Sequence, residues 1–520
     1  MKPCRCLYNH ELLIAFITQS PRLAFTDDVT DAYISSFVHE LRDTDVDCLM
    51  VCPTAWRCVL WPSAVDPRWE REDFEREEPG CWTDLKFYER AFWRIRRYMK
   101  TGHDPVQVTV DAARQQDLNL FFSYRMNDNH YFWDRNCPTH DAFAVEHPEY
   151  SLDPEGRSIC LDYGRAEVRD YYLALLRELC ETYGPEGLEL DFMRHPVFFP
   201  PGNEQEGRPI LTDFVRRVRS MLDELGEDRD RRLALSVRVP HSPEACRAAA
   251  LDVLEWDRQG LVDIINVSPH FICTLEPLEL DAFRNQVRNA RIYGELCHHT
   301  GQVQTGAFTN NILCKCTPIQ YETGAHAFLS QGADGISFFN FAYCRDNSLG
   351  EPRRAAFPGI EPRFDVLEHI TDRARLHPKA KHYWLTTGPG QLPADIPAQT
   401  SVDFPLTVYA DPELYEFGLL RILTEENHWE RPLRALVNGH ELQQTCYTGE
   451  PFVPDTFEGV PPPQQSIYYR LPPETLRNGT NVITLHNHIV KGWLLGITCR
   501  KIELALYPRP PVSFTEAVLS

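Results

Sequence analysis

The chain has 520 residues, more than one hydrophobic core usually holds, so we expect two domains. Hydrophobic residues make up 43% and charged residues 25% of the chain, which is typical of a soluble globular protein. The net charge of −22, from 53 basic and 75 acidic residues, is spread along the chain and argues against nucleic acid or an anionic membrane as a partner.

The lack of a recognisable targeting signal, together with the cysteine usage, leads us to expect a cytoplasmic protein. No apolar run approaches the ~20 residues that span a bilayer. The short apolar run at 12–17 follows Glu11 and is too short and too acidic for a signal peptide. The 17 cysteines are odd in number, and the Cys-x-Cys pairs beginning at Cys4 and Cys314 have no partner pair at zinc-site spacing. We therefore expect reduced thiols, no metal and no cofactor.

Eight apolar runs alternate with segments of helical periodicity over roughly the first 350 residues. Parallel strands joined by helices close most economically into a (β/α)8 barrel of the α/β class. An open doubly wound sheet would need a glycine-rich turn after the first strand, where Asn9-His10-Glu11 stands instead. The strands are predicted at 4–9, 46–52, 118–124, 187–193, 233–239, 262–268, 291–295 and 335–340.

Cap residues mark several of the intervening helices. Ser242 and Thr317 each precede a proline, the preferred order at a helix start, and Gly184 ends a helix predicted at 167–183. The other helices are predicted from Asp27 or Thr30, before 116, from Thr212, at 277–290 and at 364–375.

The chain changes character at about residue 385. Prolines, short alternating runs and turn signals such as Asn438-Gly439 predict a small C-terminal antiparallel β-sandwich, such as a jelly roll. The string 471–485 resembles the last strands of galactose-binding-like modules, which bind sugar in some proteins and only pack on a barrel in others. We expect a catalytic barrel at 1–384 and an accessory sandwich at 385–520 that packs on it.

The strand at 187–193 carries acids on one face. Leu188 and Leu190 share one parity, whereas Glu189 and Asp191 share the other. Acids inside a buried strand cost free energy unless they are used or paired. They therefore indicate either catalysis or a buried acid–arginine pair that only orders the barrel core.

Polar side chains occupy the ends of six of the eight strands, where a closed barrel builds its active site. Asp191 and Glu295 are predicted to face each other across the mouth, the arrangement of the two carboxyl groups in glycoside hydrolysis. We expect retention, with Asp191 as nucleophile held ionised by Arg194 or Arg238 and Glu295 as the protonated acid, although the reverse assignment stays open. The residues predicted to bind the substrate are Asn9, Glu11, Trp56, Arg125, Asn127, Asp128, Glu189, Arg194, His195, Arg238, Asn266, His270, Tyr293 and Asn340.

Aromatic residues and histidines follow the same strand ends. Aromatic rings in the loops after strands two and three suit stacking on sugars, or cover an edge of the core. Histidines after strands four to seven could bind hydroxyls or, with the two acids, hold a divalent metal. The aromatics are Trp56, Trp61, Trp82, Tyr131 and Trp133, and the histidines are His195, His241, His270, His298 and His299.

Residues 161–172 followed by 187–194 resemble the glycoside-hydrolase-like (β/α)8 proteins, described as family-ten-like glycosyl hydrolases of polysaccharide-degrading bacteria. The strings 125–128 and 294–295 also resemble that group, and the similarity spans roughly residues 4–345. The resemblance implies a sugar-cleaving barrel with Asp191 as a catalytic candidate but supplies no substrate. Glu186 and His195 depart from the pattern, which has an aspartate and an aromatic residue there.

The sequence therefore predicts a cytoplasmic glycoside hydrolase with a carbohydrate substrate, and it leaves the oligomeric state open. Two alternatives remain, a metal-dependent lyase or isomerase acting on a sugar, and a non-catalytic carbohydrate-binding barrel.

Overall fold

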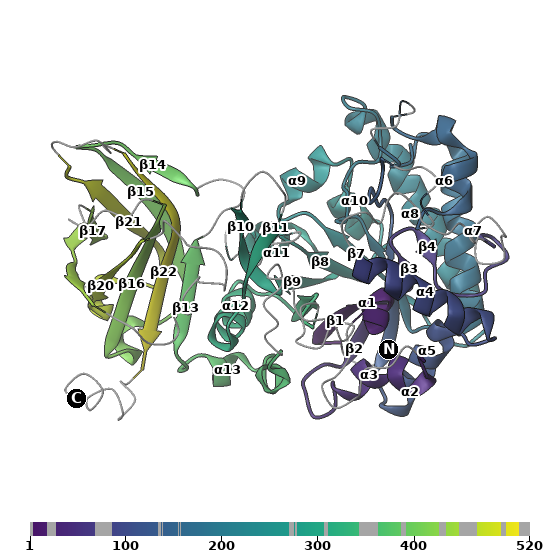
Figure 1. Cartoon of the computed structure of the whole chain (residues 1–520), viewed down its shortest axis with the longest axis horizontal. Helices are drawn as coiled ribbons and strands as arrows, with labels where there is room; N and C mark the ends of the chain where they lie inside the picture. Colours follow the sequence, from purple (N-terminus) through teal and green to yellow (C-terminus); the bar gives the residue numbers. More distant parts are fainter. Residues whose placement is uncertain are drawn as a thin grey trace.

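A computed structural model describes residues 4–17, 28–67, 86–133, 137, 139–153, 155, 158–269, 275, 278–305, 310–342, 362–385, 392–425, 433–446, 465–489 and 496–508. These residues form a barrel wrapped by helices and, beside it, a separate layer of antiparallel strands (Figure 1). Among them, no helix is long and apolar enough to cross a membrane.

Eight parallel strands close into a barrel in the order β1-β12-β9-β8-β7-β6-β5-β2. This confirms the predicted (β/α)8 fold, and each predicted strand overlaps one strand of the barrel. The strands are β1 (Cys6–Glu11), β2 (Cys48–Cys52), β5 (Asn119–Arg125), β6 (Gly187–Asp191), β7 (Ala234–Val239), β8 (Ile264–Val267), β9 (Arg291–Cys297) and β12 (Gly335–Phe339).

The helices begin and end largely where the cap residues predict. Ser242 accepts a hydrogen bond from the Ala245 amide, and Thr317 forms a capping box with Gln320. Gly184 ends its helix in the left-handed conformation, with φ 58°. The helices around the barrel are α1 (Leu12–Ile17), α2 (Asp31–Ile34), α3 (Ser36–His39), α4 (Lys86–Lys100), α5 (Pro105–Gln115), α6 (Ala142–Glu146), α7 (Ala166–Tyr183), α8 (Glu204–Glu227), α9 (Pro243–Ala248), α10 (Val253–Arg258), α11 (Leu280–Gln286) and α12 (Pro318–Ser330).

Two helix predictions need correction. The helix predicted from Thr212 begins at Glu204, because acidic residues in its first turn suit a helix N-terminus. The helix predicted at 364–375 is instead a 3-10 turn at Phe364–Leu367 and the single turn α13 (Arg373–Leu376).

Alternate residues of each barrel strand share one face, and their register stacks them in layers. Ser123 lies beside Glu189, and Arg125 beside Asp191. A separate apolar cluster fills the N-terminal end of the barrel below these polar layers. It consists of Cys4, Leu7, Cys48, Met50, Phe121, Ala234, Ile264 and Tyr293.

The C-terminal part is a sandwich of two antiparallel sheets, ordered β13-β22-β16-β20-β19, with β14 on β22, and β15-β21-β17-β18. β13 already belongs to the sandwich, and its His382 amide donates to Thr323 Oγ1 of α12 at 2.9 Å, so the sandwich contacts the barrel there. The strands are β13 (Lys381–Leu385), β14 (Ala394–Ile396), β15 (Ser401–Val408), β16 (Phe417–Thr424), β17 (Leu433–Val437), β18 (His440–Glu441), β19 (Gln443–Thr445), β20 (Gln465–Leu471), β21 (Gly479–Asn487) and β22 (Ile497–Tyr507).

Two hairpins extend the C-terminal ends of barrel strands. β3 (Thr54–Ala55) and β4 (Cys58–Val59) follow β2, whereas β10 (His299–Thr305) and β11 (Asn310–Lys315) follow β9.

Candidate active site

Arg238 on β7 joins the two predicted catalytic acids. Its Nη1 donates to both carboxylate oxygens of Asp191, at 3.0 and 3.2 Å. Its Nε and Nη2 donate to the two oxygens of Glu295, at 2.6 and 2.8 Å. None of the three side chains is more than 2% exposed. Two acids 104 positions apart in the chain, from β6 and β9, therefore meet on one guanidinium inside the barrel.

Glu295 receives a third donor. Ser268 Oγ donates to Glu295 Oε1 at 2.7 Å, and the Phe339 ring lies 4.0 Å from the Arg238 guanidinium carbon. Glu295 therefore accepts three hydrogen bonds, two from Arg238 and one from Ser268. The same group also matches the buried acid–arginine pair that the sequence left as its alternative.

Glu189 lies on the same face of β6 as Asp191, and it is fully buried. Ser123 and Ser236 donate to its two carboxyl oxygens at 2.7 and 2.9 Å, and Asn266 Nδ2 lies 3.3 Å from one of them. Burial, followed by the nearby charge of Asp191, raises the pKa of Glu189 to about 7. Glu189 is therefore a buried carboxyl with a raised pKa, enclosed below the mouth.

Three asparagines at the strand ends carry buried carbonyl oxygens for which the described residues supply no donor. They are Asn9, Asn266 and Asn340, which are 4%, 1% and 5% exposed. A buried acceptor left without a hydrogen bond costs about 1–3 kcal/mol, so water or a ligand is the usual partner. Hydroxyl groups of a bound sugar would supply such donors.

Arg125 at the end of β5 holds a second ionic group. It donates to Glu11 at the end of β1 and, at 3.2 Å, to Asp128 Oδ2. Asp128 Oδ1 accepts hydrogen bonds from the ring and from the backbone amide of His130. Although burial opposes ionisation, His130 and Arg125 lower the pKa of Asp128 well below its usual value.

Two histidines face Asp128 at the barrel mouth. His195 Nδ1 accepts from the Asn129 amide at 3.0 Å, and Arg194 contacts the far nitrogen of His130. Burial lowers the pKa of His195 to about 4, and it also lowers the pKa of His130 against the pull of Asp128. Ligand atoms of Asp128, His130 and His195 lie within 4.8 Å of one another, so these three residues could hold a divalent metal.

Aromatic rings line the loops beside these histidines. Trp56 and Tyr131 pack edge to face with centroids 5.2 Å apart, and both have positive φ, 56° and 55°. Such a backbone is strained for bulky residues, and it clusters at functional sites. Trp133 packs on Tyr131 and is 63% exposed, so it offers a face for a sugar ring. Trp61 is instead fully buried and donates to Glu178, and Trp82 lies outside the described residues.

Two predicted binding residues make structural contacts instead, and a third lies outside the described residues. Tyr293 belongs to the apolar cluster at the N-terminal end of the barrel, where its hydroxyl donates to the Cys4 carbonyl oxygen. The Asn127 amide bonds to the backbone of Leu161 and Val197, which makes it a clamp between loops. His270 lies outside the described residues.

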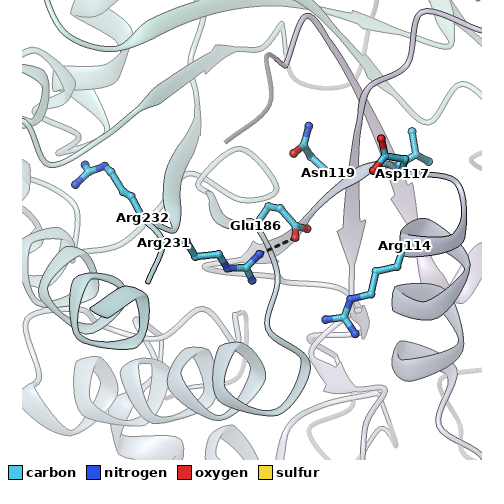
Figure 2. A pocket seen from close by; sticks show the side chains of 7 residues that line it. Arg114, Asp117, Asn119, Glu186, Arg231 and Arg232 are labelled. Atoms are coloured by element: carbon cyan, nitrogen blue, oxygen red, sulfur yellow. Dashed lines mark hydrogen bonds and ion pairs between the residues drawn. The ribbon is translucent and has the colours of Figure 1, made fainter. Parts of the chain in front are cut away.

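A cavity of about 350 Å³ opens at the N-terminal ends of β5 and β6, opposite the mouth (Figure 2). Its Arg231 donates to Glu186 at 2.8 Å and to the Gly184 carbonyl oxygen at 2.7 Å. Arg114 likewise donates to the Tyr183 carbonyl oxygen. These contacts hold backbone at the N-terminal face of the barrel, the face that usually serves stability, so we assign the cavity a structural role.

No protein-family model and no curated protein matches the chain. Among solved structures, it is similar to a maltogenic α-amylase from Thermotoga neapolitana (13% identity, TM-score 0.39, covering 93% of this chain and 99% of that one). It is also similar to an α-L-fucosidase from Bacteroides thetaiotaomicron (11% identity, TM-score 0.37, 96% and 93%).

A cycloisomaltooligosaccharide glucanotransferase from Paenibacillus is a third similar structure (12% identity, TM-score 0.32, covering 96% of this chain). This chain spans 57% of the length of the glucanotransferase. Likeness at this level decides neither activity nor substrate, so function is argued below from the chain's own residues.

Sequence reasoning assigned no role to His130 or Cys297. The Asp-x-His spacing from Asp128 to His130 could have pointed to His130 as a possible metal ligand. The Cys-His-His run at 297–299, where the Glu295 strand ends, could have pointed to Cys297.

Proposed function

We propose that the protein is a glycoside hydrolase that cleaves a short oligosaccharide or glycoside. One observation carries the proposal: carboxylates from β6 and β9 converge on Arg238 near the C-terminal ends of the barrel strands. Most glycosidases work with a pair of Asp or Glu carboxyl groups.

The contacts favour one division of labour. Glu295 accepts from Arg238 at 2.6 and 2.8 Å, shorter contacts than the 3.0 and 3.2 Å that Arg238 makes with Asp191, and Glu295 is the proposed nucleophile in a retaining reaction. Asp191 Oδ2 accepts from Arg238 at 3.2 Å, the longest contact in the group, and Asp191 is the proposed acid and base. This reverses the assignment expected from the sequence.

Sugar binding would use the groups around the mouth. The buried carbonyl oxygens of Asn9, Asn266 and Asn340 suit hydroxyl donors, and Trp133 suits the apolar face of a ring. These features also fit a non-catalytic sugar-binding barrel, which would bind a sugar but release no product.

The test is a panel of nitrophenyl glycosides and oligosaccharides, with the anomer of the first product read by NMR. We expect Asp191→Asn and Glu295→Gln each to lower turnover by at least about 10²-fold, the lower range for a lost acid–base group. Azide should partly restore the turnover of the Glu295→Gly variant, because a small anion can replace a missing nucleophile. Asp263→Asn is the matched control, because Asp263 pairs with Arg232 at the opposite end of the barrel. Wild-type rates in either folded variant would end the proposal.

A metal-dependent lyase or isomerase is the second candidate, favoured by the grouping of Asp128, His130 and His195 at the mouth. This candidate would be supported over the hydrolase if a chelator removes the activity, a divalent ion restores it, and the His195→Ala variant has none. Activity that survives both the chelator and His195→Ala would exclude it.

A further inference from the structure

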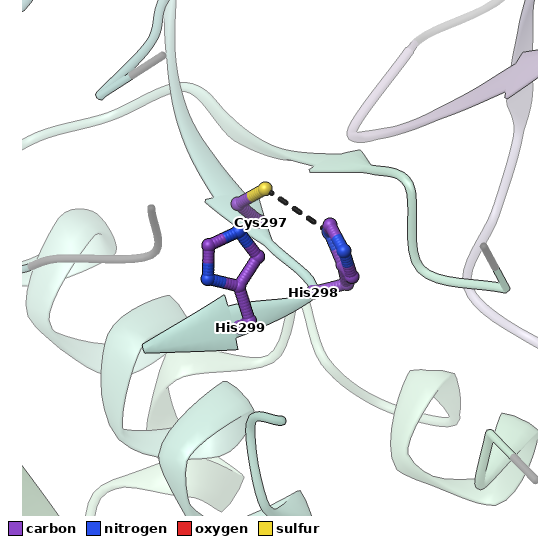
Figure 3. Close-up of side chains that lie close together, drawn as sticks. All are labelled: Cys297, His298 and His299. Carbon is purple, nitrogen blue, oxygen red and sulfur yellow. Dashed lines mark hydrogen bonds between the residues drawn. The ribbon is translucent and has the colours of Figure 1, made fainter. Parts of the chain in front are cut away.

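A thiol and two imidazoles lie together where β9 passes into the β10–β11 hairpin. Cys297 ends β9, and His299 begins β10, with His298 between them. All three side chains are buried, at 0%, 2% and 0% exposure. Their ligand atoms lie within 4.8 Å of one another, and Figure 3 shows the Cys297 thiol turned toward the His298 ring.

The spacing of these atoms fits a small tetrahedral cation. Zinc binds sulfur at ~2.3 Å and nitrogen at ~2.0–2.1 Å, which puts neighbouring ligand atoms ~3.3–3.8 Å apart. Cys297 Sγ and His298 Nδ1 are already 3.3 Å apart. The two imidazole rings are close and nearly perpendicular, with centroids 4.6 Å apart and planes at 82°. All three donor atoms therefore lie within reach of one ion.

The chain is also closely tied together at this point. The Cys316 amide donates to the His298 carbonyl oxygen at 3.0 Å, and Cys316 Sγ lies 3.3 Å from the Cys297 carbonyl oxygen. The β10–β11 hairpin therefore leaves and rejoins the barrel at a single place, directly before α12. An ion at this place would join the end of a barrel strand to the base of the hairpin.

We propose that Cys297, His298 and His299 form a zinc site that fastens the β10–β11 hairpin to the barrel. Binding breaks the S–H bond of Cys297, whose proton passes to solvent, and uses both imidazoles in their neutral form. Thiolate and imidazole ligands together select zinc over magnesium or calcium. The site departs from the sequence-based expectation that the protein needs no metal.

The site is independent of the proposed hydrolase reaction. It holds different residues from the Asp191–Arg238–Glu295 group, and its role is to hold structure rather than to transfer protons. It also differs in chemistry from the Asp128, His130 and His195 group, because that group offers no thiolate.

Cobalt(II) substitution in the full-length chain tests the proposal. We expect cobalt to bind with a sulfur-to-cobalt charge-transfer band and the strong visible bands of tetrahedral coordination. Cys297→Ser should remove the charge-transfer band. His298→Ala and His299→Ala should each weaken zinc binding by more than the ~10–100-fold that loss of an outer partner costs. His130→Ala should leave the charge-transfer band unchanged.

Two further measurements keep the test decisive. Cys446→Ser removes an exposed thiol and controls for adventitious binding, so its spectrum should match that of the wild type. If a ligand variant fails to fold, a His195→Ala chain, which lacks one ligand of the other candidate metal group, still reports, because zinc added to its metal-free form should raise its Tm in proportion to the logarithm of zinc concentration. A cobalt spectrum without the sulfur band, or a Tm unmoved by zinc, would overturn the proposal.

Discussion

Arg238 is the residue on which both candidate acids depend, because one guanidinium faces two buried carboxylates. Replacing it in Arg238→Met leaves Asp191 and Glu295 buried without their counter-charge. We expect a loss of about 3–5 kcal/mol in the free energy of unfolding, measured by urea denaturation.

Arg232→Met is the control for Arg238→Met, because the Arg232 side chain is 53% exposed in its pair with Asp263. Its loss should be within about 1 kcal/mol, as for other exposed ion pairs. Equal losses in the two variants would contradict the buried ionic group.

Glu189 predicts a pH dependence of stability. Its pKa rises from an ordinary 4.5 to about 7 on folding, so between these values the folded chain holds a proton that the unfolded chain has lost. Its contribution to stability is therefore complete below about pH 4.5, and it is lost as the pH rises through about 7.

We expect the free energy of unfolding of the wild type, relative to that of Glu189→Gln, to fall by about 3 kcal/mol as the pH rises from about 4.5 to about 7. Urea unfolding at several pH values would measure this change. A difference that stays constant with pH would show that Glu189 is already ionised at pH 5.

At the scale of elements, the packing of β6 fixes where Asp191 and Glu189 lie. A Cβ on Gly187, at the start of this strand, would lie 2.5 Å from the Phe121 ring and 2.8 Å from the Ala234 carbonyl oxygen. Both neighbours belong to strands paired with β6. Gly187→Ala should therefore cost about 1–3 kcal/mol by overpacking, measured as a lower urea midpoint.

Gly496→Ala is the counterpart of Gly187→Ala, because nothing lies within 4 Å of a Cβ at that position. Its urea midpoint should equal that of the wild type. A wild-type midpoint in Gly187→Ala would mean that β6 can shift without loss.

At the scale of the whole molecule, a buried ionic cluster in the sandwich lies next to the contact between sandwich and barrel. Glu503 on β22 is buried and meets His382, Arg421 and Lys501, at 3.0, 3.2 and 3.2 Å. Its His382 partner lies on β13, the strand that bonds to α12 of the barrel. Glu503→Gln removes the shared carboxylate, so we expect a loss of about 3–5 kcal/mol in the free energy of unfolding.

Calorimetry would measure this change, with Glu441→Gln as its control, because Glu441 forms an exposed pair with Arg434. We expect the control to match the wild type within about 1 kcal/mol. A small effect of Glu503→Gln would indicate that the cluster rearranges without cost.

The sequence by itself determined the architecture, because strand and helix periods, caps and turn residues act over short distances along the chain. The alternation of Leu188, Glu189, Leu190 and Asp191 predicted a barrel strand with an acidic face, and the structure has β6 there. The sequence offered Arg194 or Arg238 as the cation beside Asp191, and the structure places Arg238 there, whereas Arg194 contacts His130.

Only the tertiary structure decided how those side chains are used. Nothing local in the chain shows that Arg238 would bond both Asp191 and Glu295, or that Tyr293 would fill the closed end of the barrel. Such partners are set by strand order and register, which join residues far apart in the chain. The physical reason is that hydrogen bonds and burial are properties of positions in space, whereas the sequence pattern reports only the face on which a residue lies.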